Sequence, residues 1–243
     1  LNSYMETANA ADLFVVAGYG LSGEDQAEIK QENADVEFGY FTDTVIGDTP
    51  NAIRVFSQTT DISIFELVSG EFPTKSNEVA LAQTMADQYK IGDTIRLNES
   101  GSSTLLKEHE FTITGFVNSS EILSKTIKGV SSAGSGDLSG FAVVPKDTFD
   151  SEVYTIARLR YPDLRKWKTT SREYADKVAQ LQQALEEKLA DNGAARLDAL
   201  KTTADDKISE GKEKIADAKT QLSDAEKKLT DGKSEIEKNE KTL

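Results

Sequence analysis

A seven-residue repeat at the C-terminal end constrains the fold of this chain more than any other feature. Large aliphatic residues recur there at steps of seven without a break, and they are Ile208, Ile215, Leu222, Leu229, Ile236 and Leu243. This spacing keeps the side chains on one side of an α-helix and is typical of the a positions of a left-handed coiled coil. The sequence therefore predicts a coiled-coil stalk helix over residues 194–243, about 70 Å long from Arg196 onward.

Small or polar residues stand three positions after the large ones, at the d positions. They are Gly211, Ala218, Ala225, Gly232 and Asn239. A glycine inside a helix costs about 1 kcal/mol relative to alanine, so two glycines on one seam need a reason, and the close approach of a second helix supplies one. We predict that the a and d residues form a coiled-coil interface with an antiparallel helix, and a homodimeric coiled coil is the alternative.

The ends of the chain suggest a piece of a longer protein. The chain starts at Leu1 rather than at Met, and the repeat continues to Leu243. We expect a truncated stalk whose antiparallel return helix is absent from this chain and lies beyond Leu243.

Charge separates the front of the chain from the stalk. Residues 1–150 hold 9 Lys or Arg and 23 Asp or Glu, so they carry the entire net charge of −14. An acidic surface repels polyanions and lacks the counterion-release energy that dominates binding to nucleic acid. We therefore predict no nucleic-acid partner. A cationic partner and a merely solvated acidic surface both remain open.

The front of the chain reads as an α+β core domain over residues 1–168, with a mixed small sheet. Short helices are predicted at residues 24–32 and 84–89, and strands at residues 11–17, 36–46, 51–58, 78–81, 94–97, 110–117, 141–145 and 153–161. An amphipathic helix is predicted over residues 169–192, and its apolar side chains are Tyr174, Val178, Leu181, Leu185 and Leu189. Asn192 and Gly193 are expected to interrupt it before the stalk.

A glycine-rich segment, GYGLSG at residues 18–23, matches the spacing of a dinucleotide-binding loop and has Asp43 about twenty residues later. A nucleotide-binding enzyme is therefore an alternative function of a different class. The following order of one helix and two consecutive strands does not fit the alternation that such a fold requires. We favour a turn into a helix that starts with a capping box of Ser22 and Asp25.

Residue types suited to catalysis are scarce. There is no Cys, and His109 is the only histidine, so a histidine triad or a multi-histidine zinc site would need another chain. Serines in the glycine-rich stretch, which are Ser131, Ser132, Ser135 and Ser139, do not match a nucleophile elbow. We predict no catalytic, cofactor-binding or metal-binding residues and a non-catalytic domain.

Residues 69–97 contain a series of turns and strands with a familiar spacing. The matching positions are Gly70, Pro73, Asn77, Glu78, Val79, Leu81, Gly92, Asp93 and Ile95. With the strands at 111–117 and 141–149, this pattern resembles the extracytoplasmic core domain of FtsX-like and MacB-like ABC transporter permeases, over about residues 10–160. The stalk resembles the coiled-coil insertions of a Gram-positive branch of these permeases.

The resemblance implies a location and a role. The chain would be an extracellular domain at the cell membrane of a Gram-positive bacterium, with residues 1–10 continuing a transmembrane helix. Its partner would be a cytoplasmic ATPase subunit, reached through the transmembrane helices, and the domain would transmit motion for export of, or resistance toward, peptides or lipids. FtsX-like activation of a peptidoglycan hydrolase through the coiled coil is the alternative, with that envelope protein as partner. A free-standing coiled-coil scaffold or adhesin is a further alternative.

Overall fold

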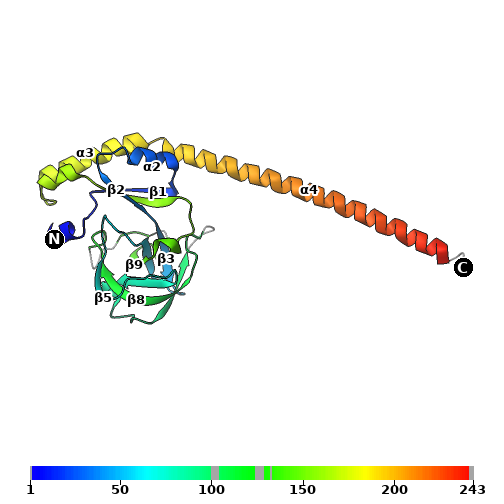
Figure 1. The fold of residues 1–243 in the computed structure, drawn as a ribbon, viewed down its shortest axis with the longest axis horizontal. Coiled ribbons are helices and arrows are strands. Elements are labelled where there is room, and N and C mark those ends of the chain that lie inside the picture. The colour runs from blue at the N-terminus through cyan, green and yellow to red at the C-terminus, as the bar shows by residue number, and fades with distance from the viewer. Residues whose placement is uncertain (1, 100–103, 124–128, 132, 241–243) are drawn as a thin grey trace. The chain divides into compact units, whose positions relative to one another are not determined.

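The computed structural model describes residues 2–99, 104–123, 129–131 and 133–240, and it divides the chain into two compact units (Figure 1). The first unit is Leu1–Gly193 and the second is Ala194–Leu243. The first unit contains a small sheet, a larger closed sheet and three α-helices. The second consists of most of one long helix.

The small sheet has three strands in the order β1-β10-β2, which are Leu13–Leu21, Tyr154–Arg160 and Asp35–Gly39. β1 and β2 each run antiparallel to β10, so they run parallel to each other. Helices α2 (Gly23–Ile29) and α3 (Arg172–Leu189) cover one face of this sheet (Figure 1). Ile29 of α2, Leu159 of β10 and Leu185 of α3 are buried together between the two layers.

The larger sheet has seven strands in the order β5-β8-β6-β9-β4-β3-β7. Their bounds are β3 Phe41–Ile46, β4 Ala52–Ser57, β5 Glu66–Gly70, β6 Glu78–Ala82, β7 Thr94–Glu99, β8 Glu110–Asn118 and β9 Leu138–Val144. β7 also pairs with β8, so six strands form a closed ring and only β5 is attached outside it. Two of the pairs, β4–β9 and β6–β8, are parallel, which makes the sheet mixed.

Closure gives this barrel a continuous apolar core. Its fully buried side chains include Ile53, Val79, Leu97, Phe111 and Ile113. Because a closed barrel has few free strand edges, its backbone hydrogen bonds are satisfied internally. The barrel is therefore expected to be stiff and to support the small sheet that contacts it.

Two strand predictions needed correction. The run at residues 36–46, predicted as one strand, forms β2 and β3, which belong to different sheets and are separated by Tyr40. The backbone N–H of Tyr40 donates to Ser57 Oγ at 2.9 Å instead of continuing a ladder. β5 had no predicted counterpart, since all five of its residues are exposed and it shows no apolar alternation.

Short 3₁₀ turns connect several elements: η1 (Gln83–Met85), η2 (Lys146–Thr148) and η3 (Pro162–Lys166). η1 replaces the helix predicted at residues 84–89, so that prediction was too long. A short helix α1 (Asn2–Thr7) precedes β1. Within the described residues, no helix combines the length and the apolar character that crossing a bilayer requires.

Helices α3 and α4 follow each other closely in the chain. Ser171 caps α3 by accepting a hydrogen bond from the backbone N–H of Tyr174 at 3.2 Å. α3 ends at Leu189, and α4 (Asn192–Glu240) begins at Asn192. The interruption therefore falls at residues 190–191, two residues before the predicted position, because Asn192 already belongs to the next helix.

Candidate functional site

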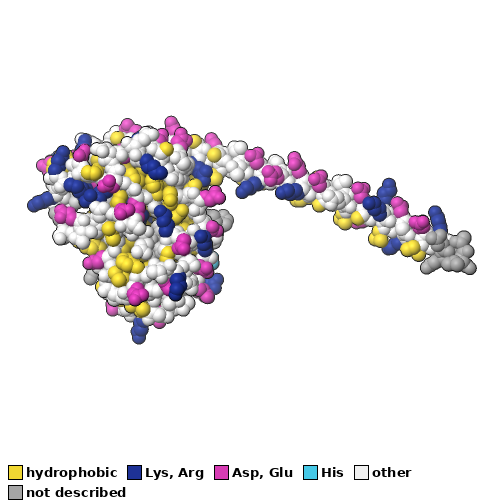
Figure 2. Space-filling view, in the orientation of Figure 1, with side chains coloured by type: hydrophobic (Ala, Val, Ile, Leu, Met, Phe, Trp, Pro, Cys, Tyr) yellow, Lys and Arg dark blue, Asp and Glu magenta, His cyan; other side chains and the backbone are white. Residues whose placement is uncertain are grey.

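The predicted coiled-coil seam lies along α4 with its large residues in solvent. Ile208, Ile215, Leu222, Leu229 and Ile236 are exposed to between 54% and 62%. Figure 2 shows hydrophobic side chains recurring along one side of this helix. A β-carbon added at Gly211 or Gly232 would have no atom within 4 Å.

Some of the other predicted seam residues are also exposed to solvent, and the rest lie outside the described residues. Ala218 and Ala225 are exposed on α4. The side chain of Asn239 and the whole of Leu243 lie outside the described residues. The pairing of this seam with a second helix therefore stays a prediction.

The GYGLSG segment does not form the loop that a dinucleotide fingerprint needs. Gly18 and Gly20 lie within β1, which extends four residues beyond its predicted end. The helix that follows has seven residues, and the predicted capping box is present: Ser22 Oγ accepts from the backbone N–H of Asp25, and Asp25 Oδ2 accepts from that of Ser22. The sheet beside it is antiparallel, so the nucleotide-binding alternative loses its structural basis.

The remaining chemically notable residues make structural contacts. His109 Nδ1 lies 3.2 Å from the carbonyl oxygen of Leu97. Ser131 Oγ accepts from the backbone N–H of Ala133, and Ser132 lies outside the described residues. In the described part of the chain, no group of three or more His, Cys, Asp or Glu side chains is arranged to hold a metal ion.

A well-connected polar region of the first unit is a short segment between α1 and β1, residues 8–12, which we call the anchor segment. It pairs with the loop at residues 61–64. The backbone N–H of Ser63 donates to the carbonyl of Asn9 at 3.0 Å, and that of Ile64 donates to the carbonyl of Ala8 at 2.8 Å. Ser63 Oγ accepts from the backbone N–H of Ala11 at 3.1 Å. Asn9 Nδ2 also donates to the carbonyl of Asp61.

Two non-glycine residues of this pairing have left-handed backbone conformations. Asn9 has φ 50° and Ser63 has φ 54°. For residues other than glycine, such conformations cost of the order of 1–3 kcal/mol and persist where the surroundings hold them in place. The hydrogen bonds between the two segments supply that restraint.

Asp12 ties the end of the anchor segment to the region around α3. Its side chain is 1% exposed and forms an ion pair with Arg165. It also accepts from Tyr174 Oη at 2.6 Å and from the backbone N–H of Tyr161 at 2.7 Å. Burial, followed by the hydrogen bond to Asp12, raises the pKa of Tyr174 well above its ordinary value. Tyr174 therefore stays protonated as the donor.

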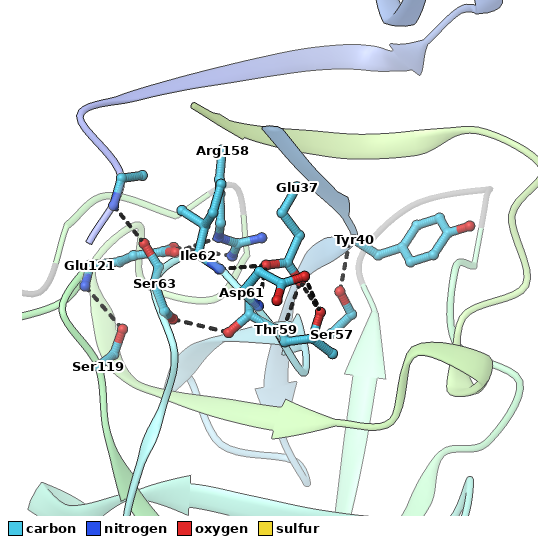
Figure 3. Close-up of polar contacts among 12 residues, drawn as sticks. Glu37, Tyr40, Ser57, Thr59, Asp61, Ile62, Ser63, Ser119, Glu121 and Arg158 are labelled. Carbon is cyan, nitrogen blue, oxygen red and sulfur yellow. Dashed lines mark hydrogen bonds and ion pairs between the residues drawn. The ribbon is translucent and has the colours of Figure 1, made fainter. Parts of the chain in front are cut away.

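The loop that receives the anchor segment is held by one carboxylate of the small sheet. Glu37 on β2 accepts from the backbone N–H groups of Thr60, Asp61 and Ile62 at 2.7–2.9 Å. Thr59 Oγ1 closes the loop by donating to the carbonyl of Ser63 at 3.0 Å. Figure 3 shows the loop lying beside Glu37, with Arg158 and Glu121 close by. The small sheet and the barrel are thus joined by polar contacts.

Arg158 forms the second connection between the two sheets. It lies on β10, opposite both Phe14 of β1 and Glu37 of β2. Its side chain is fully buried and pairs with Glu121, in the loop after β8, through Nε and Nη2 (Figure 3). Because a buried charge is costly unless it is paired, this ion pair holds the two sheets in one arrangement.

Sequence reasoning did not identify this polar junction. Glu37, Arg158 and Glu121 come from three distant parts of the chain, and none belongs to a recognisable motif. The one local signal was Arg158, a charged residue within the otherwise apolar run from Ile156 to Leu159 of β10, whereas Glu37 continues the polar and apolar alternation of β2. Polar residues at such positions are more often exposed than buried, so the signal could not have been decisive.

Comparisons with known proteins place the first unit in a wider context. The family model of the MacB-like periplasmic core domain matches residues 2–188. One similar solved structure is the extracellular domain of the noncanonic ABC-type transporter YknZ from Gram-positive bacteria. It is 10% identical, the match covers 70% of this chain and 93% of that chain, and the TM-score is 0.38. No curated protein matches this chain.

Proposed function

The chain belongs to the family of MacB-like periplasmic core domains, and from this premise we propose that it carries motion from the membrane into the cell envelope. The family match confirms the resemblance predicted from the sequence, together with an α+β core followed by a long helix. As the extracellular domain of an ABC transporter permease, it would take no catalytic step itself. ATP hydrolysis on a separate cytoplasmic subunit would move the transmembrane helices. The domain itself would lie at the surface of a Gram-positive cell.

The observation that carries this proposal is the position of the anchor segment. It follows α1, and it is bonded on one side to the loop at residues 61–64 and on the other, through Asp12, to Tyr174 at the start of α3. A displacement of α1 would therefore act on the barrel and on α3 together. Since α3 leads into α4, such a displacement has a covalent route to the stalk.

Transmission of motion requires stiff parts, and the first unit has them. The closed barrel satisfies its own strand edges, and the Glu37 and Arg158 contacts bind it to the small sheet. Packed cores move as bodies between discrete arrangements rather than deforming continuously. We propose that the first unit moves as one body when α1 is displaced. We also propose that α4 changes its position relative to that body, with the change taken up at residues 190–191 between α3 and α4.

For the stalk we propose pairing with an antiparallel return helix. The support is the row of large side chains more than half exposed, beside glycines with open space around them. Glycine and alanine permit close approach of two helix backbones. The same exposed row favours a second candidate function, in which the stalk engages a peptidoglycan hydrolase in the envelope. In that case the motion of the stalk would activate the hydrolase, and no peptide or lipid would be transported.

The test uses the parent transporter with its ATPase subunit in a lipid bilayer. Nitroxide labels at Ile91→Cys on the core surface and Lys201→Cys on α4 would report the distance between the two units. We expect this distance to change when ATP is hydrolysed. The double variant Asn9→Ala with Ser63→Ala removes side-chain bonds of the anchor segment, and we expect it to retain ATP hydrolysis within about twofold while the distance change falls by half or more.

A matched control comes from a hydroxyl in the barrel. Thr114 Oγ1 donates to the carbonyl of Glu71 far from the anchor segment, and Thr114→Ala should leave the ATP-driven distance change intact. Thermal melting checks that every variant is folded. A distance that stays constant during hydrolysis in the unmodified transporter would refute the proposal.

A further inference from the structure

A cavity of about 260 Å³ lies where α1 meets the larger sheet, at the ends of β6 and β8. Part of its wall is apolar and includes Val117, Ile122 and Phe141. The polar part includes Tyr4 of α1, Glu66 of β5, Gln83 of η1 and Asn118 of β8. Pockets that bind small molecules typically combine apolar walls with a few polar groups. This cavity has that composition, and it is separate from the anchor segment and from the seam of α4.

The charge of the cavity is negative. Among the described residues that line it, only Glu66 is charged. Asn118 Nδ2 donates to Glu66 Oε2 at 3.1 Å, and in the described part of the chain no Lys or Arg forms an ion pair with this carboxylate. Residues 1–150 as a whole have the same excess of carboxylates over cations. A cation is therefore the favoured occupant.

Two oxygens of the lining residues have no hydrogen-bond partner within the described residues. They are Tyr4 Oη and Gln83 Oε1, and both are buried. Leaving a buried polar group unpaired is unfavourable, and such groups in native proteins call for an explanation. Burial, followed by the negative charge of Glu66, raises the pKa of Tyr4, so its hydroxyl stays protonated. A ligand with several N–H donors would supply partners for these oxygens.

We propose that this cavity binds a primary ammonium group carried on a short apolar chain, with the ammonium held by Glu66, Gln83 and Tyr4. An ammonium offers three N–H donors, one for each of these side chains, and its charge pairs with the carboxylate. The apolar chain would lie against the wall that Ile122 and Phe141 help to form. A calcium ion fits less well, because it takes about six to eight oxygen ligands and the described lining offers one carboxylate.

A bound amine would connect two parts of the first unit. Tyr4 lies on α1, whereas Glu66 and Asn118 lie on strands of the larger sheet. The ligand would therefore hold α1 against that sheet and oppose the displacement of α1 on which the proposed function depends. Binding itself does not require that displacement. It is measured on the chain without an ATPase subunit, so the site and the transmission of motion can fail independently.

Titration of the isotope-labelled 243-residue chain with n-butylamine, followed by two-dimensional NMR, tests this site. We expect saturable shifts of the side-chain amide signals of Gln83 and Asn118. n-Butanol has the same apolar chain without the charge, so we expect it to bind at least about tenfold more weakly. Equal binding of the alcohol and the amine would overturn the ammonium site, as would the absence of saturable shifts.

A second ligand distinguishes two sources of the ammonium. Nα-acetyl-lysine methylamide carries the same group and chain on a peptide unit. Tighter binding of this compound than of n-butylamine would support the site and assign it to lysine side chains of polypeptides. Tighter binding of n-butylamine would support the site and assign it to free amines.

Matched charge variants test the role of Glu66. Glu66→Gln removes the charge and should weaken the binding of n-butylamine at least about tenfold. Glu71→Gln removes a carboxylate outside the described lining, and it should change the affinity by less than about twofold. Thermal melting checks that both variants are folded. Equal weakening by the two variants would trace the binding to the acidic surface in general and overturn the site.

Tyr4→Phe separates binding from folding. It removes a hydroxyl that has no partner within the described residues, so the melting temperature should not fall, whereas the affinity for n-butylamine should fall about threefold. A lower melting temperature with an unchanged affinity would give the hydroxyl a structural role and overturn its part in the site.

Discussion

α3 and α4 are both amphipathic helices, yet only one of them has a partner among the described residues of this chain. α3 places Leu185 in the core at 5% exposure, with Val178 and Leu181 packed beside it. The large residues of α4 remain more than half exposed, with Leu222 at 60%. The comparison teaches that an apolar stripe specifies a helix but does not specify what covers the stripe. The spacing of the stripe carries that information: irregular steps of three and four fit a globular core, and strict steps of seven fit another long helix.

The largest expected contrast concerns ion pairs in the two regions. Arg158→Ala leaves Glu121 buried and unpaired, so it should lower the free energy of unfolding by about 4 kcal/mol. The side chains of Lys201 and Asp198, which form an ion pair on α4, are 64% and 79% exposed. Lys201→Ala should therefore change the free energy of unfolding by less than about 0.5 kcal/mol. Urea unfolding followed by the fluorescence of Trp167, the only tryptophan, measures the first variant, and far-ultraviolet circular dichroism measures the second.

A double variant sharpens this prediction. Arg158→Met combined with Glu121→Leu removes both charges, and it should recover most of the lost stability because a well-packed apolar pair avoids the desolvation cost. A loss below about 1 kcal/mol for Arg158→Ala alone would mean that the pair does not hold the sheets together.

The next contrast compares the two apolar stripes directly. Leu185→Ala removes a buried side chain and should cost about 3 kcal/mol. Leu222→Ala in the same 243-residue chain should cost less than about 0.5 kcal/mol, since this side chain is already in solvent. Equal losses would show that α4 pairs with a second copy, and sedimentation velocity would then detect the dimer.

Glycine substitutions should have opposite signs in the two regions. A β-carbon at Gly115 in the barrel would lie 2.6 Å from the carbonyl oxygen of Glu71, so Gly115→Ala should cost about 2 kcal/mol through overpacking. Gly211→Ala meets open space and should stabilise α4 by about 1 kcal/mol in this chain. Thermal melting by circular dichroism measures both. In a polypeptide that includes the return helix, a stabilising Gly211→Ala would contradict close packing at the d positions.

The smallest expected effect concerns a carboxylate that the barrel holds in hydrogen bonds. Hydrogen bonding by the backbone N–H of Thr74, and then by Lys75, lowers the pKa of Glu78 from an ordinary 4.5 to about 2. A pKa that is lower in the folded state stabilises the fold above about pH 4.5, and this contribution is lost as the pH falls toward 2. Glu78→Gln should therefore cost about 1 kcal/mol at pH 7 and nothing near pH 2.

The matched control is Glu226→Gln on the exposed face of α4. It should leave the stability of the core unchanged over the same pH range. A cost for Glu78→Gln that persists undiminished at pH 2 would trace the effect to packing instead of charge. Urea midpoints measured at several pH values decide between the two.

Local sequence patterns determined the local structure of this protein. The seven-residue repeat predicted the long helix α4, and Ser22 with Asp25 predicted the start of α2, because capping and helix periodicity depend on residues within one or two turns of each other. Most strands of the barrel were also predicted within a few residues. The family resemblance included Asn77, Glu78 and Val79 but gave no reason for a glutamate at position 78. The structure supplies the reason, because the carboxylate of Glu78 accepts hydrogen bonds from the backbone N–H groups of Thr74 and Lys75 and so holds that turn.

Only the tertiary structure decided which distant segments meet. The run at residues 36–46 divides between two sheets, β1 continues through its glycines beside β10, and Asp12 joins Tyr174 and Arg165 across about 150 residues. The burial of Arg158 opposite Glu121 depends on the same long-range pairing. Such contacts are selected by the packing of whole elements, whose energy is shared among many residues. The repeat of α4 predicts a helix and a need for a partner, whereas the partner's identity lies in tertiary contacts that a single stripe does not encode.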